Sequence, residues 1–528
     1  MTSRRSSMSR RKSAPARASA AEPAKIAVWL LAVLLAARLA RLFYSEVWVE
    51  DDFYLESAFL VSAGMRPYLD FVHPHIPVLE WIAGAYLRLF GASHLSIELL
   101  NEAAIYATSL LVFALGRRAA GRRAAIASAI LYGFSSLVFR YHVYERECFV
   151  APLVVAAAIL AIDRRWSRIR LCGALAAIMV LACSIKLTAA VPAAVIVGFI
   201  AIADRRWGPA ILTALAIAGG LAILSAFLYW LYGFEFILQT FLFHLMKGHD
   251  TTLSIAAYPR LILDLLAPLF VLGLVELAAS RALGRAMGLV LATAAAQYVF
   301  FGLMSPTAWA HNYLEPLPFV AIIASIGLLA TLDALRAAVG GEDAAGAAWL
   351  RVTAAGALIA ICLAWATPLV NESWLRGSVY GFGFIPRAEI AQIAAGLRDA
   401  TGPADEVIAP SFICFEANRR ELIRYPEMYG VWREAESEYR RDGLGRAREN
   451  LSRADFLKLI AETAHFWRDP IKRAVTDGSV KAVINDSPIQ LLPLVYLPDE
   501  FLAANGFHPA MRTEHFTLWL RAGAPGPN

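Results

Sequence analysis

Residues 26–54 read IAVWLLAVLLAARLARLFYSEVWVEDDFY, an apolar segment that ends shortly before two adjacent acids, Asp51 and Asp52. A helix that crosses a membrane needs about 20 mostly apolar residues, so we interpret 26–45 as a first membrane span. No small-residue cleavage site follows it, and we expect it to be retained rather than removed as a signal peptide. Carboxylates at the mouth of a membrane bundle are costly unless they are solvated, paired or used. The acidic pair is therefore the best pointer to function in the sequence.

The composition of the whole chain indicates a protein with many membrane spans. Of its 528 residues, 59% are hydrophobic and 17% are charged, and the mean hydropathy is +0.54. A soluble domain has roughly 45–50% apolar and about 25% charged residues. The net charge of +6 does not indicate nucleic-acid binding, because the arginines cluster between apolar segments, where membrane topology explains them. The five scattered cysteines form no CxxC spacing, so we expect neither a disulfide framework nor a cysteine–zinc site.

Further apolar segments predict a polytopic transmembrane helix bundle of about eleven spans. The segment 171–203 is interrupted by Lys186 and Pro192, and it is compatible with one broken span or with two short ones. The predicted spans after the first lie at 97–116, 124–140, 148–163, 171–185, 187–203, 209–232, 259–279, 286–304, 314–333 and 352–370.

The arginines between these segments set the predicted orientation. Every second connection carries arginine, at 117–123, 164–170, 205–206, 281–285 and 336–351. Cytoplasmic loops of membrane proteins carry an excess of Lys and Arg, so we place these connections and the basic, disordered tail 1–24 in the cytoplasm. We expect a multi-pass protein of the plasma (inner) membrane. The extracytoplasmic regions are then loops 46–96 and 141–147, the short turn near Lys186, loops 233–258 and 305–313, and all residues after 371.

Two of the extracytoplasmic regions are predicted to fold. The first outer loop contains the segments 53–63 and 77–90, which we expect to be short helices on the membrane surface. Residues 371–528 are less apolar, with strand patterns at 406–409, 481–485 and 516–521 and helix patterns around 387–400 and 453–467. The predicted fold class is mainly α, with a transmembrane bundle over 25–370 and a small α/β extracytoplasmic domain over 371–528.

The predicted topology brings polar residues from separate spans to the extracytoplasmic side of the membrane. Single charges at membrane depth can be accidental, but several charges from different spans on one face indicate a site. The residues are Asp51, Asp52, His73, His75, Tyr144, Glu145, Arg146, Glu147, Lys186, His249, Asp250, His311, Asn312 and Tyr313.

Three acids from this set are the predicted catalytic residues. A general base must accept a proton from an attacking hydroxyl, and a poorly solvated carboxylate such as Asp51 becomes a stronger base beside lipid. The alternative for Asp52 is an N-cap of the helix at 53–63. The third catalytic acid is Glu147. It, or Glu145, which is assigned to the substrate-binding residues, is predicted to orient the acceptor or to assist Asp51. The alternative for both glutamates is internal salt bridging at a helix start.

The cationic and aromatic members of the set are predicted to bind phosphate. Arg146 and Lys186 are expected to pair with a phosphate or a carboxylate, and the alternative for Lys186 is a side chain that snorkels to the surface. His311 and Tyr313 are predicted to hydrogen-bond a phosphate oxygen, unless they belong to an interfacial aromatic belt. His249, from loop 233–258, is assigned to the same substrate-binding set.

The first outer loop resembles that of the GT-C superfamily of integral-membrane glycosyltransferases. The resemblance rests on the stretch Asp51-Asp52-x-Tyr54…Gly64-x-x-Pro67-Tyr68…His73-Pro74…Pro77. It is most similar to polyprenyl- or dolichyl-phosphate-sugar transferases, such as protein O-mannosyltransferases and bacterial aminoarabinose transferases. Their acidic pair is usually Asp-Glu, so Asp52 departs from the pattern.

Further agreement lies in later loops. Glu145 and Glu147 follow the third span, Lys186 follows the fifth, and the element His311-Asn312-Tyr313-x-x-Pro316-x-Pro318 is similar to the start of a late family span. The likeness covers roughly residues 25–330, whereas 371–528 match no domain.

The resemblance implies a mechanism and a set of partners. The donor is a sugar linked to a polyprenyl phosphate, and the acceptor is a hydroxyl of a glycan, glycolipid or protein that enters from the aqueous side. Asp51 takes the proton of that hydroxyl, inversion follows, and Lys186 and the His311 region hold the leaving phosphate. Tyr68 and His73 are expected to contact substrate. No cofactor besides the donor is expected; a divalent cation stays open, since His73-x-His75 has metal-pair spacing but no evident set of further ligands.

Two other classes of function remain open as alternatives. A polytopic transporter or flippase of a lipid-linked or small polar substrate would also have many spans and buried charges. Against it, the sequence has no inverted repeat, its acids lie at one face, and a sizeable outer domain follows. A non-catalytic assembly subunit with a decayed site is the third class.

Overall fold

The computed structural model describes most of the helical bundle and of the C-terminal domain. The described ranges are 52–138, 144–163, 167–203, 205–242, 258–280, 283–304, 310–339, 384–423, 462–486 and 497–523, with the strand 46–48 and a few single positions.

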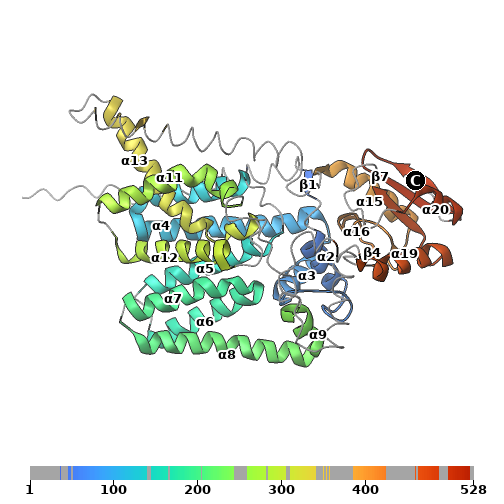
Figure 1. The fold of residues 1–528 in the computed structure, drawn as a ribbon, viewed down its shortest axis with the longest axis horizontal. Coiled ribbons are helices and arrows are strands. Elements are labelled where there is room, and N and C mark those ends of the chain that lie inside the picture. The colour runs from blue at the N-terminus through green and yellow to red at the C-terminus, as the bar shows by residue number, and fades with distance from the viewer. Residues whose placement is uncertain are drawn as a thin grey trace, which may run out of the picture.

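The larger part of the molecule is a bundle of long helices whose axes run side by side (Figure 1). By length and composition, five described segments could cross a membrane: His94–Gly133, Arg168–Ile185, Trp207–Tyr232, Arg285–Met304 and Leu317–Ala337. The elements of the bundle are α4 (His94–Val138), α5 (Arg146–Ile162), α6 (Arg168–Ile185), η2 (Leu187–Ala189), α7 (Ala190–Ala203), α8 (Trp207–Tyr232), α11 (Tyr258–Ser280), α12 (Arg285–Val299), η4 (Phe300–Met304), η5 (Ala310–Leu314) and α13 (Leu317–Val339).

The helices of the bundle coincide with the predicted spans. Every predicted span except 26–45 and 352–370 falls on a described helix, and these two lie almost wholly outside the described residues. The number of eleven spans therefore stays a prediction. The ambiguous segment 171–203 forms two helices, α6 and α7, because the extended backbone of Lys186 (φ −151°, ψ 124°) interrupts the helix between them.

The element α4 is a helical hairpin. Gly121 interrupts it with φ 84° and ψ −176°, a conformation outside the helical region. A Cβ atom built on Gly116 would lie 3.2 Å from the Cα of Ala125 and 2.7 Å from the Oγ of Ser128. Residues nine positions apart in a straight helix are separated by about 13 Å, so the chain must reverse between them. The reversal lies inside the arginine-rich connection 117–123 that separates two predicted spans.

Two short helices from the first outer loop cover the end of the bundle that faces the C-terminal domain (Figure 1). They are α2 (Asp52–Ser62) and α3 (Val78–Phe90), in the positions predicted for helices at 53–63 and 77–90. A Cβ on Gly84 of α3 would lie 2.7 Å from the Cγ1 of Val61, so this glycine permits close contact between the two helices. The helix α9 (Phe234–Ile237) and the π-helical turn η3 (Leu238–Leu242) pack beside them.

The C-terminal domain is a small α/β unit. Its elements are β2 (Phe384–Pro386), α15 (Arg387–Ala400), β3 (Glu406–Val407), α16 (Ser411–Ala417), β4 (Arg420–Glu421), α19 (His465–Asp477), β5 (Ala482–Asp486), α20 (Asp499–Ala504), β6 (Phe507–Arg512) and β7 (Phe516–Arg521). Strands β5, β7 and β6 form an antiparallel sheet in that order, and β3 pairs with β4 in parallel.

The alternation of side chains along β5 and β7 explains the layers of this domain. Leu518 and Leu520 point to one core with α15 and α16, whereas Trp519 points to another with α19, as the two-residue period of a strand requires. The predicted strands at 481–485 and 516–521 and the predicted helix around 387–400 are present. The predicted helix 453–467 lies mostly outside the described residues, and α19 continues beyond its predicted end. Strand β6 was not predicted.

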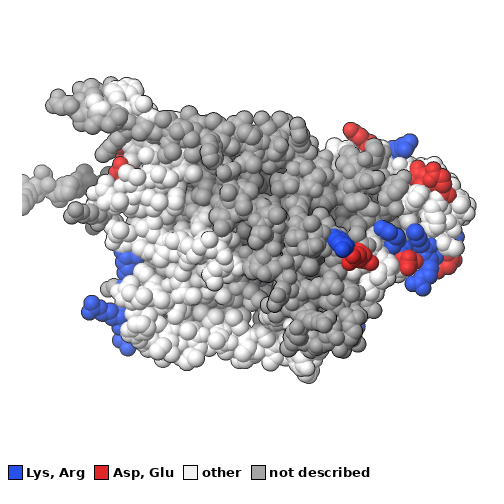
Figure 2. All heavy atoms as spheres, in the orientation of Figure 1, with Lys and Arg blue, Asp and Glu red and all other residues white. Residues whose placement is uncertain are grey.

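Basic residues gather at the end of the bundle away from the C-terminal domain. The connections at that end carry Arg117, Arg118, Arg122, Arg123, Arg168, Arg205, Arg206 and Arg285. Figure 2 shows basic side chains at this end, on the left, a middle belt whose described surface has few charged side chains, and both charge signs on the C-terminal domain. Exposed side chains of α8 within the belt are apolar, including Ile211, Leu215, Ile223 and Trp230, as expected of a lipid-facing surface.

Candidate functional site

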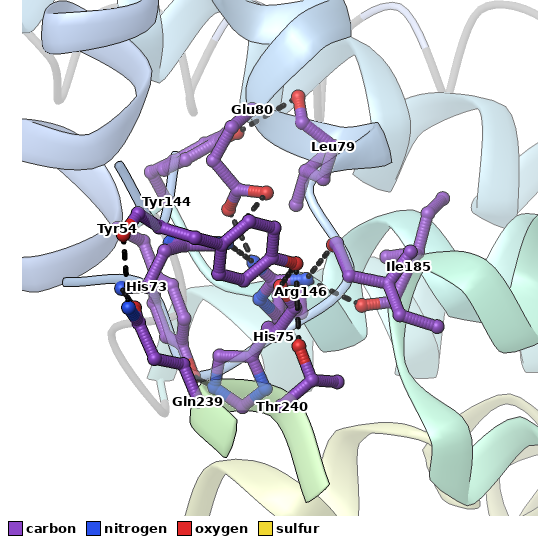
Figure 3. Close-up of polar contacts among 12 residues, drawn as sticks. Tyr54, His73, His75, Leu79, Glu80, Tyr144, Arg146, Ile185, Gln239 and Thr240 are labelled. Atoms are coloured by element: carbon purple, nitrogen blue, oxygen red, sulfur yellow. Dashed lines mark hydrogen bonds and ion pairs between the residues drawn. The ribbon is translucent and has the colours of Figure 1, made fainter. Parts of the chain in front are cut away.

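Arg146 is the centre of a buried polar cluster at the start of α5. Its side chain is fully buried and donates hydrogen bonds to the backbone carbonyls of Ile185, at 2.6 Å, and Ile76, at 3.3 Å. It also forms an ion pair with the carboxylate of Glu80 on α3, and its Nη2 lies 3.3 Å from the Nε2 of His73 (Figure 3). We call Arg146, Glu80 and His73 the arginine cluster.

Glu80 supplies the negative charge of the arginine cluster. Its side chain is fully buried, and its Oε2 lies 3.3 Å from the Nε2 of His73. Burial alone would raise the pKa of Glu80, but the charges of Arg146 and His73 outweigh burial and lower this pKa to about 2. The carboxylate is therefore ionised. The carbonyls of Ile76 and Ile185 both accept from the Nη1 of Arg146, which satisfies that end of the guanidinium, as a buried ion pair requires.

The loop between α2 and α3 is held by the turn after α8. Tyr68 adopts a left-handed backbone (φ 66°), which is unfavourable for a bulky residue unless its surroundings enforce it. Gln239 donates from Nε2 to the Tyr68 carbonyl at 3.0 Å and accepts at Oε1 from the backbone N–H of His73 at 2.9 Å. The Tyr68 hydroxyl donates to the carbonyl of His75. Gln239 therefore fixes the loop that carries His73.

Lys186 is the centre of a second buried cluster. Its ammonium forms an ion pair with Glu147 and donates to the Oδ1 of Asn312 at 2.7 Å. The carboxylate of Glu315 lies 3.6 Å away and accepts hydrogen bonds from Thr188 at 2.6 Å and Gln297 at 3.3 Å. The Lys186 side chain is only 13% exposed, so it lies inside the protein rather than snorkelling to the surface. We call Lys186, Glu147, Asn312 and Glu315 the lysine cluster.

The two clusters adjoin each other and the start of α2. Arg146 and Glu147 are consecutive on α5, and the Ile185 carbonyl that binds Arg146 immediately precedes Lys186. The Cζ of Arg146 lies 4.9 Å from the centre of the Tyr54 ring. Since Tyr54 is two residues after Asp52, the first turn of α2 lies beside the arginine cluster. Figure 3 shows the side chains of Tyr54, Glu80 and Tyr144 gathered near Arg146.

Several predicted site residues lie outside the described part of the site. Asp51 and His249 are not described, and of Asp52 and His311 only the backbone is, at the start of α2 and within η5. Their predicted roles stay predictions. Glu145 occupies the N-cap position of α5 and makes no side-chain capping bond.

The remaining predicted residues are described and are mostly buried. Tyr313 is fully buried, with its ring 5.4 Å from that of Tyr298. His73 faces Glu80 and Arg146, and the Nε2 of His75 lies 3.1 Å from the Tyr54 hydroxyl oxygen, so the Nε2 atoms of these two histidines, whose spacing left a metal pair open, have protein partners. The salt bridge foreseen within Tyr144–Glu147 is made instead to two other segments, by Arg146 to Glu80 and by Glu147 to Lys186.

Glu80 and Glu315 are candidate site residues that were not predicted. Glu80 lies on the stripe of α3 that also buries Ala83, Gly84 and Leu87, which is the spacing of one helical face. A single acid on an otherwise apolar face was therefore a usable signal. Glu315 precedes the apolar run of α13, and its partners come from α12 and the α6–α7 connection.

One further group of metal-ligand type lies in the C-terminal domain. Among the described residues, Glu389, Glu514 and His515 bring one donor atom each within 4.8 Å of one another. The Nδ1 of His515 is 2.7 Å from the Oε2 of Glu389, and the His515 backbone N–H donates to the Oε1 at 2.7 Å. These are hydrogen-bond distances, so the contacts are explained without a metal ion.

Comparison with known proteins supports the predicted resemblance. Residues 72–230 match a family model described as dolichyl-phosphate-mannose-protein mannosyltransferase. No curated protein sequence matches the chain. Among solved structures, ArnT from Cupriavidus metallidurans bound to undecaprenyl phosphate matches with a TM-score of 0.59 and 14% identity, over 97% of this chain and 100% of that chain.

Two further solved structures match with lower TM-scores. ArnT from the same organism in the apo state gives a TM-score of 0.57 at 14% identity, over 94% of this chain and 97% of that one. The Archaeoglobus fulgidus oligosaccharyltransferase, tethered with an acceptor peptide, gives 0.49 at 14% identity, over 87% and 69%. With the family match to residues 72–230 and the ArnT fold over nearly the whole chain, the chain is a multi-pass membrane protein with the fold of the GT-C superfamily.

Proposed function

We propose that the chain is a membrane glycosyltransferase that moves a sugar from a polyprenyl-phosphate donor to an acceptor hydroxyl on the outer face of the plasma (inner) membrane. One observation carries the proposal. A buried lysine cluster, an arginine cluster and the start of α2, where the acidic pair lies in the sequence, meet at one end of the bundle. An acid that accepts a proton and a cation that stabilises a leaving phosphate are the two functions that this transfer requires.

The names of similar proteins support the donor class. The matched family model names dolichyl-phosphate mannose as the donor of its members, and the structure with a TM-score of 0.59 contains undecaprenyl phosphate. Dolichyl phosphate, the lipid part of that donor, and undecaprenyl phosphate are both polyprenyl phosphates. The acceptor of this chain is then a glycan, glycolipid or protein, as part of cell-envelope, lipopolysaccharide or protein glycosylation.

The proposed reaction is a single inverting displacement. The acceptor oxygen attacks the anomeric carbon, its proton passes to Asp51, and the bond from the anomeric carbon to the phosphate oxygen breaks, which releases the polyprenyl phosphate. The phosphate leaves as an anion and needs little general acid catalysis, so cationic contacts are sufficient. A retaining mechanism needs two carboxylates about 5–5.5 Å apart across the anomeric centre. Asp51 and Asp52 are adjacent in the sequence, and side chains of neighbouring residues face each other neither in a helix nor in an extended chain, so the pair is poorly suited to this geometry.

The lysine cluster fits this chemistry because a phosphate can replace or share one of the two carboxylate contacts of Lys186. Lys186 faces two carboxylates, Glu147 and Glu315, so the cluster carries excess negative charge when both are ionised. A phosphate that binds Lys186 must displace or share the contact with Glu147, which would free the Glu147 carboxylate to orient the acceptor. A divalent cation beside these acids is the alternative way to balance the phosphate, and activity before and after treatment with a chelator distinguishes the two.

Transfer in reconstituted vesicles tests the proposal. The full chain in liposomes receives polyprenyl-phosphate mannose, glucose or aminoarabinose, labelled in the sugar, together with envelope glycolipids and proteins as acceptors. We expect one donor to be consumed and its label to appear in one acceptor class. Asp51→Asn should abolish transfer, whereas Asp405→Asn, at an exposed ion pair of the C-terminal domain, should not. Movement of an intact lipid-linked sugar across the membrane without its consumption would instead establish a flippase.

A further inference from the structure

The segment that carries the acidic pair is bounded on both sides by contacts with the C-terminal domain. Strand β1 (Glu46–Trp48) ends three residues before Asp51, and α2 begins at Asp52. Each residue of an extended chain covers at most about 3.6 Å, and only residues 49–51 connect the two elements, so β1 and α2 are joined by a short connection.

The C-terminal domain holds the first of these elements by strand pairing. Strand β1 pairs with β2 in antiparallel register, with Val47 opposite Ile385 and Glu46 opposite Pro386. Ile385 is fully buried in a core of the C-terminal domain. The chain before the acidic pair is thus an extension of that domain.

The second element, α2, packs against α16 of the same domain. The ring of Phe415 on α16 lies 5.7 Å from the ring of Phe59 on α2, in an edge-to-face arrangement. Phe415 belongs to the hydrophobic core of the membrane bundle, whereas its neighbour Phe412 belongs to a core of the C-terminal domain. The helix α16 is therefore shared between the two parts of the molecule.

Two polar contacts fix the domain against the start of α4. The Nη2 of Arg387, the first residue of α15 after β2, donates to both carboxylate oxygens of Glu98 at 2.6 and 2.7 Å. The carboxylate of Glu416 on α16 lies 2.8 Å from the Nδ1 of His94 and accepts from the His94 backbone N–H at 3.1 Å. Glu98 and His94 are buried. The first contact joins α4 to α15, directly after β2, and the second joins α4 to α16.

We propose that the C-terminal domain positions the acidic pair, with Arg387 and Glu416 acting as positioning residues. This inference rests on the proposed function, in which Asp51 is the general base. Catalytic groups must be held within about 0.5 Å of their productive geometry, and a displacement of about 1 Å can lower the rate about 10²-fold. The domain would thus be part of the transferase machinery although it supplies no reacting group.

The proposal is tested by removing the contact between Arg387 and Glu98 and then linking β1 to β2 with a disulfide. Arg387→Ala should lower kcat at least tenfold and leave the KM for the donor unchanged, because the phosphate contacts are intact. The pair Glu46→Cys and Pro386→Cys should form a disulfide, because opposed Cα atoms of antiparallel strands lie about 4.5–5.5 Å apart, within the range that a disulfide spans. Added to Arg387→Ala, the oxidised disulfide should restore kcat, and reduction should abolish the rescue. The exchange Glu98→Arg with Arg387→Glu should restore kcat without a disulfide.

A control variant and two different negative results distinguish failure of the positioning role from failure of the proposed function. Lys481→Ala breaks a 2.9 Å ion pair with Asp405 inside the C-terminal domain and should change neither kcat nor KM. The positioning proposal is overturned if the double-cysteine variant that retains Arg387 does not form the disulfide. It is also overturned if the disulfide forms in the Arg387→Ala variant and kcat stays low. If the Glu46→Cys/Pro386→Cys protein forms the disulfide, and neither it nor the unmodified protein consumes lipid-linked sugar, the proposed function is refuted, and the positioning role is refuted with it.

Discussion

Arg146 donates a 2.6 Å hydrogen bond to the backbone carbonyl of Ile185. This bond joins the first turn of α5 to the last turn of α6, whose terminal carbonyls lack partners within the helix. Because Glu147 follows Arg146 and Lys186 follows Ile185, the same bond sets the acid and the lysine side by side. The arginine cluster therefore acts as the structural support of the lysine cluster.

Replacement of Arg146 should strongly destabilise the protein. Arg146→Met leaves the fully buried carboxylate of Glu80 without its guanidinium, and the loss of one partner of a buried ion pair costs about 3–5 kcal/mol. The free energy of unfolding in mixed micelles, measured by titration with denaturing detergent, should fall by this amount. Arg123→Met provides the matched control, because its 2.7 Å pair with Asp333 is exposed and such pairs contribute about 1 kcal/mol or less. Similar losses in both variants would contradict the structural role of Arg146.

Replacement of Lys186 should separate stability from activity. Lys186→Met leaves Glu147 and Glu315 as neighbouring buried acids, so it should lower both stability and the rate of sugar transfer. Adding Glu147→Gln removes one of the two acids that have lost the lysine, and with it their mutual repulsion, so it should recover part of the stability. The rate should stay about 10²–10³-fold low, because the leaving phosphate still lacks its cation. Transfer assays and micelle unfolding on the single and double variants check this. Recovery of the rate in the double variant would exclude Lys186 as a phosphate contact.

The membrane part of the fold was predictable because the signals for spans and connections, apolar length and arginine-rich loops, are each contained in a short stretch of sequence. Each span has to bury its backbone in helical hydrogen bonds within the bilayer, so apolar length alone located α4 to α8 and α11 to α13 closely. The break at Lys186 was visible as a charge inside an apolar run. The hairpin at Gly121 followed from the arginines that surround it.

The partners within the site were less predictable because they are distant in sequence. The topology brought Glu147, Lys186 and Asn312 to one side of the membrane, and the structure joins them in one cluster. Glu80 was missed because acids on short helices are usually solvated, and its partner, Arg146, is 66 residues away in the sequence. Contacts such as Arg387 with Glu98 depend on how a domain docks, and no spacing in the sequence encodes them.

The turn of the α4 hairpin should require glycine. Gly121 has φ 84° and ψ −176°, a region that only glycine occupies readily, at a cost of order 1–3 kcal/mol for other residues. A Cβ atom there meets nothing within 4 Å, so Gly121→Ala should destabilise through the backbone alone. Gly173→Ala is the matched control, since this glycine of α6 also has open space and alanine is favoured in helices by about 0.5–1 kcal/mol. Micelle unfolding should therefore give opposite signs for the two variants, and equal signs would place the strain elsewhere.

Acidification should loosen the contact between α15 and the β6–β7 turn before it unfolds the bundle. Burial alone would raise the pKa of Glu389, but hydrogen bonds from Thr513 and from the backbone and ring of His515 outweigh it, so this pKa lies below its ordinary value. A carboxyl whose pKa is lowered by folding stabilises the protein above its unfolded pKa of about 4.3, and this contribution disappears as pH falls through the lower folded value.

Hydrogen exchange of the β7 amides between pH 3 and pH 7, corrected for intrinsic rates, measures this contribution. Protection should decline below about pH 4 in the unmodified protein. Glu389→Gln should reduce protection already at pH 7 and flatten its pH dependence, because the amide cannot provide two anionic acceptors. Glu514→Gln changes the exposed neighbouring acid of the same turn and should preserve the unmodified profile. If Glu514→Gln flattens the profile and Glu389→Gln does not, the titrating group has been assigned to the wrong residue.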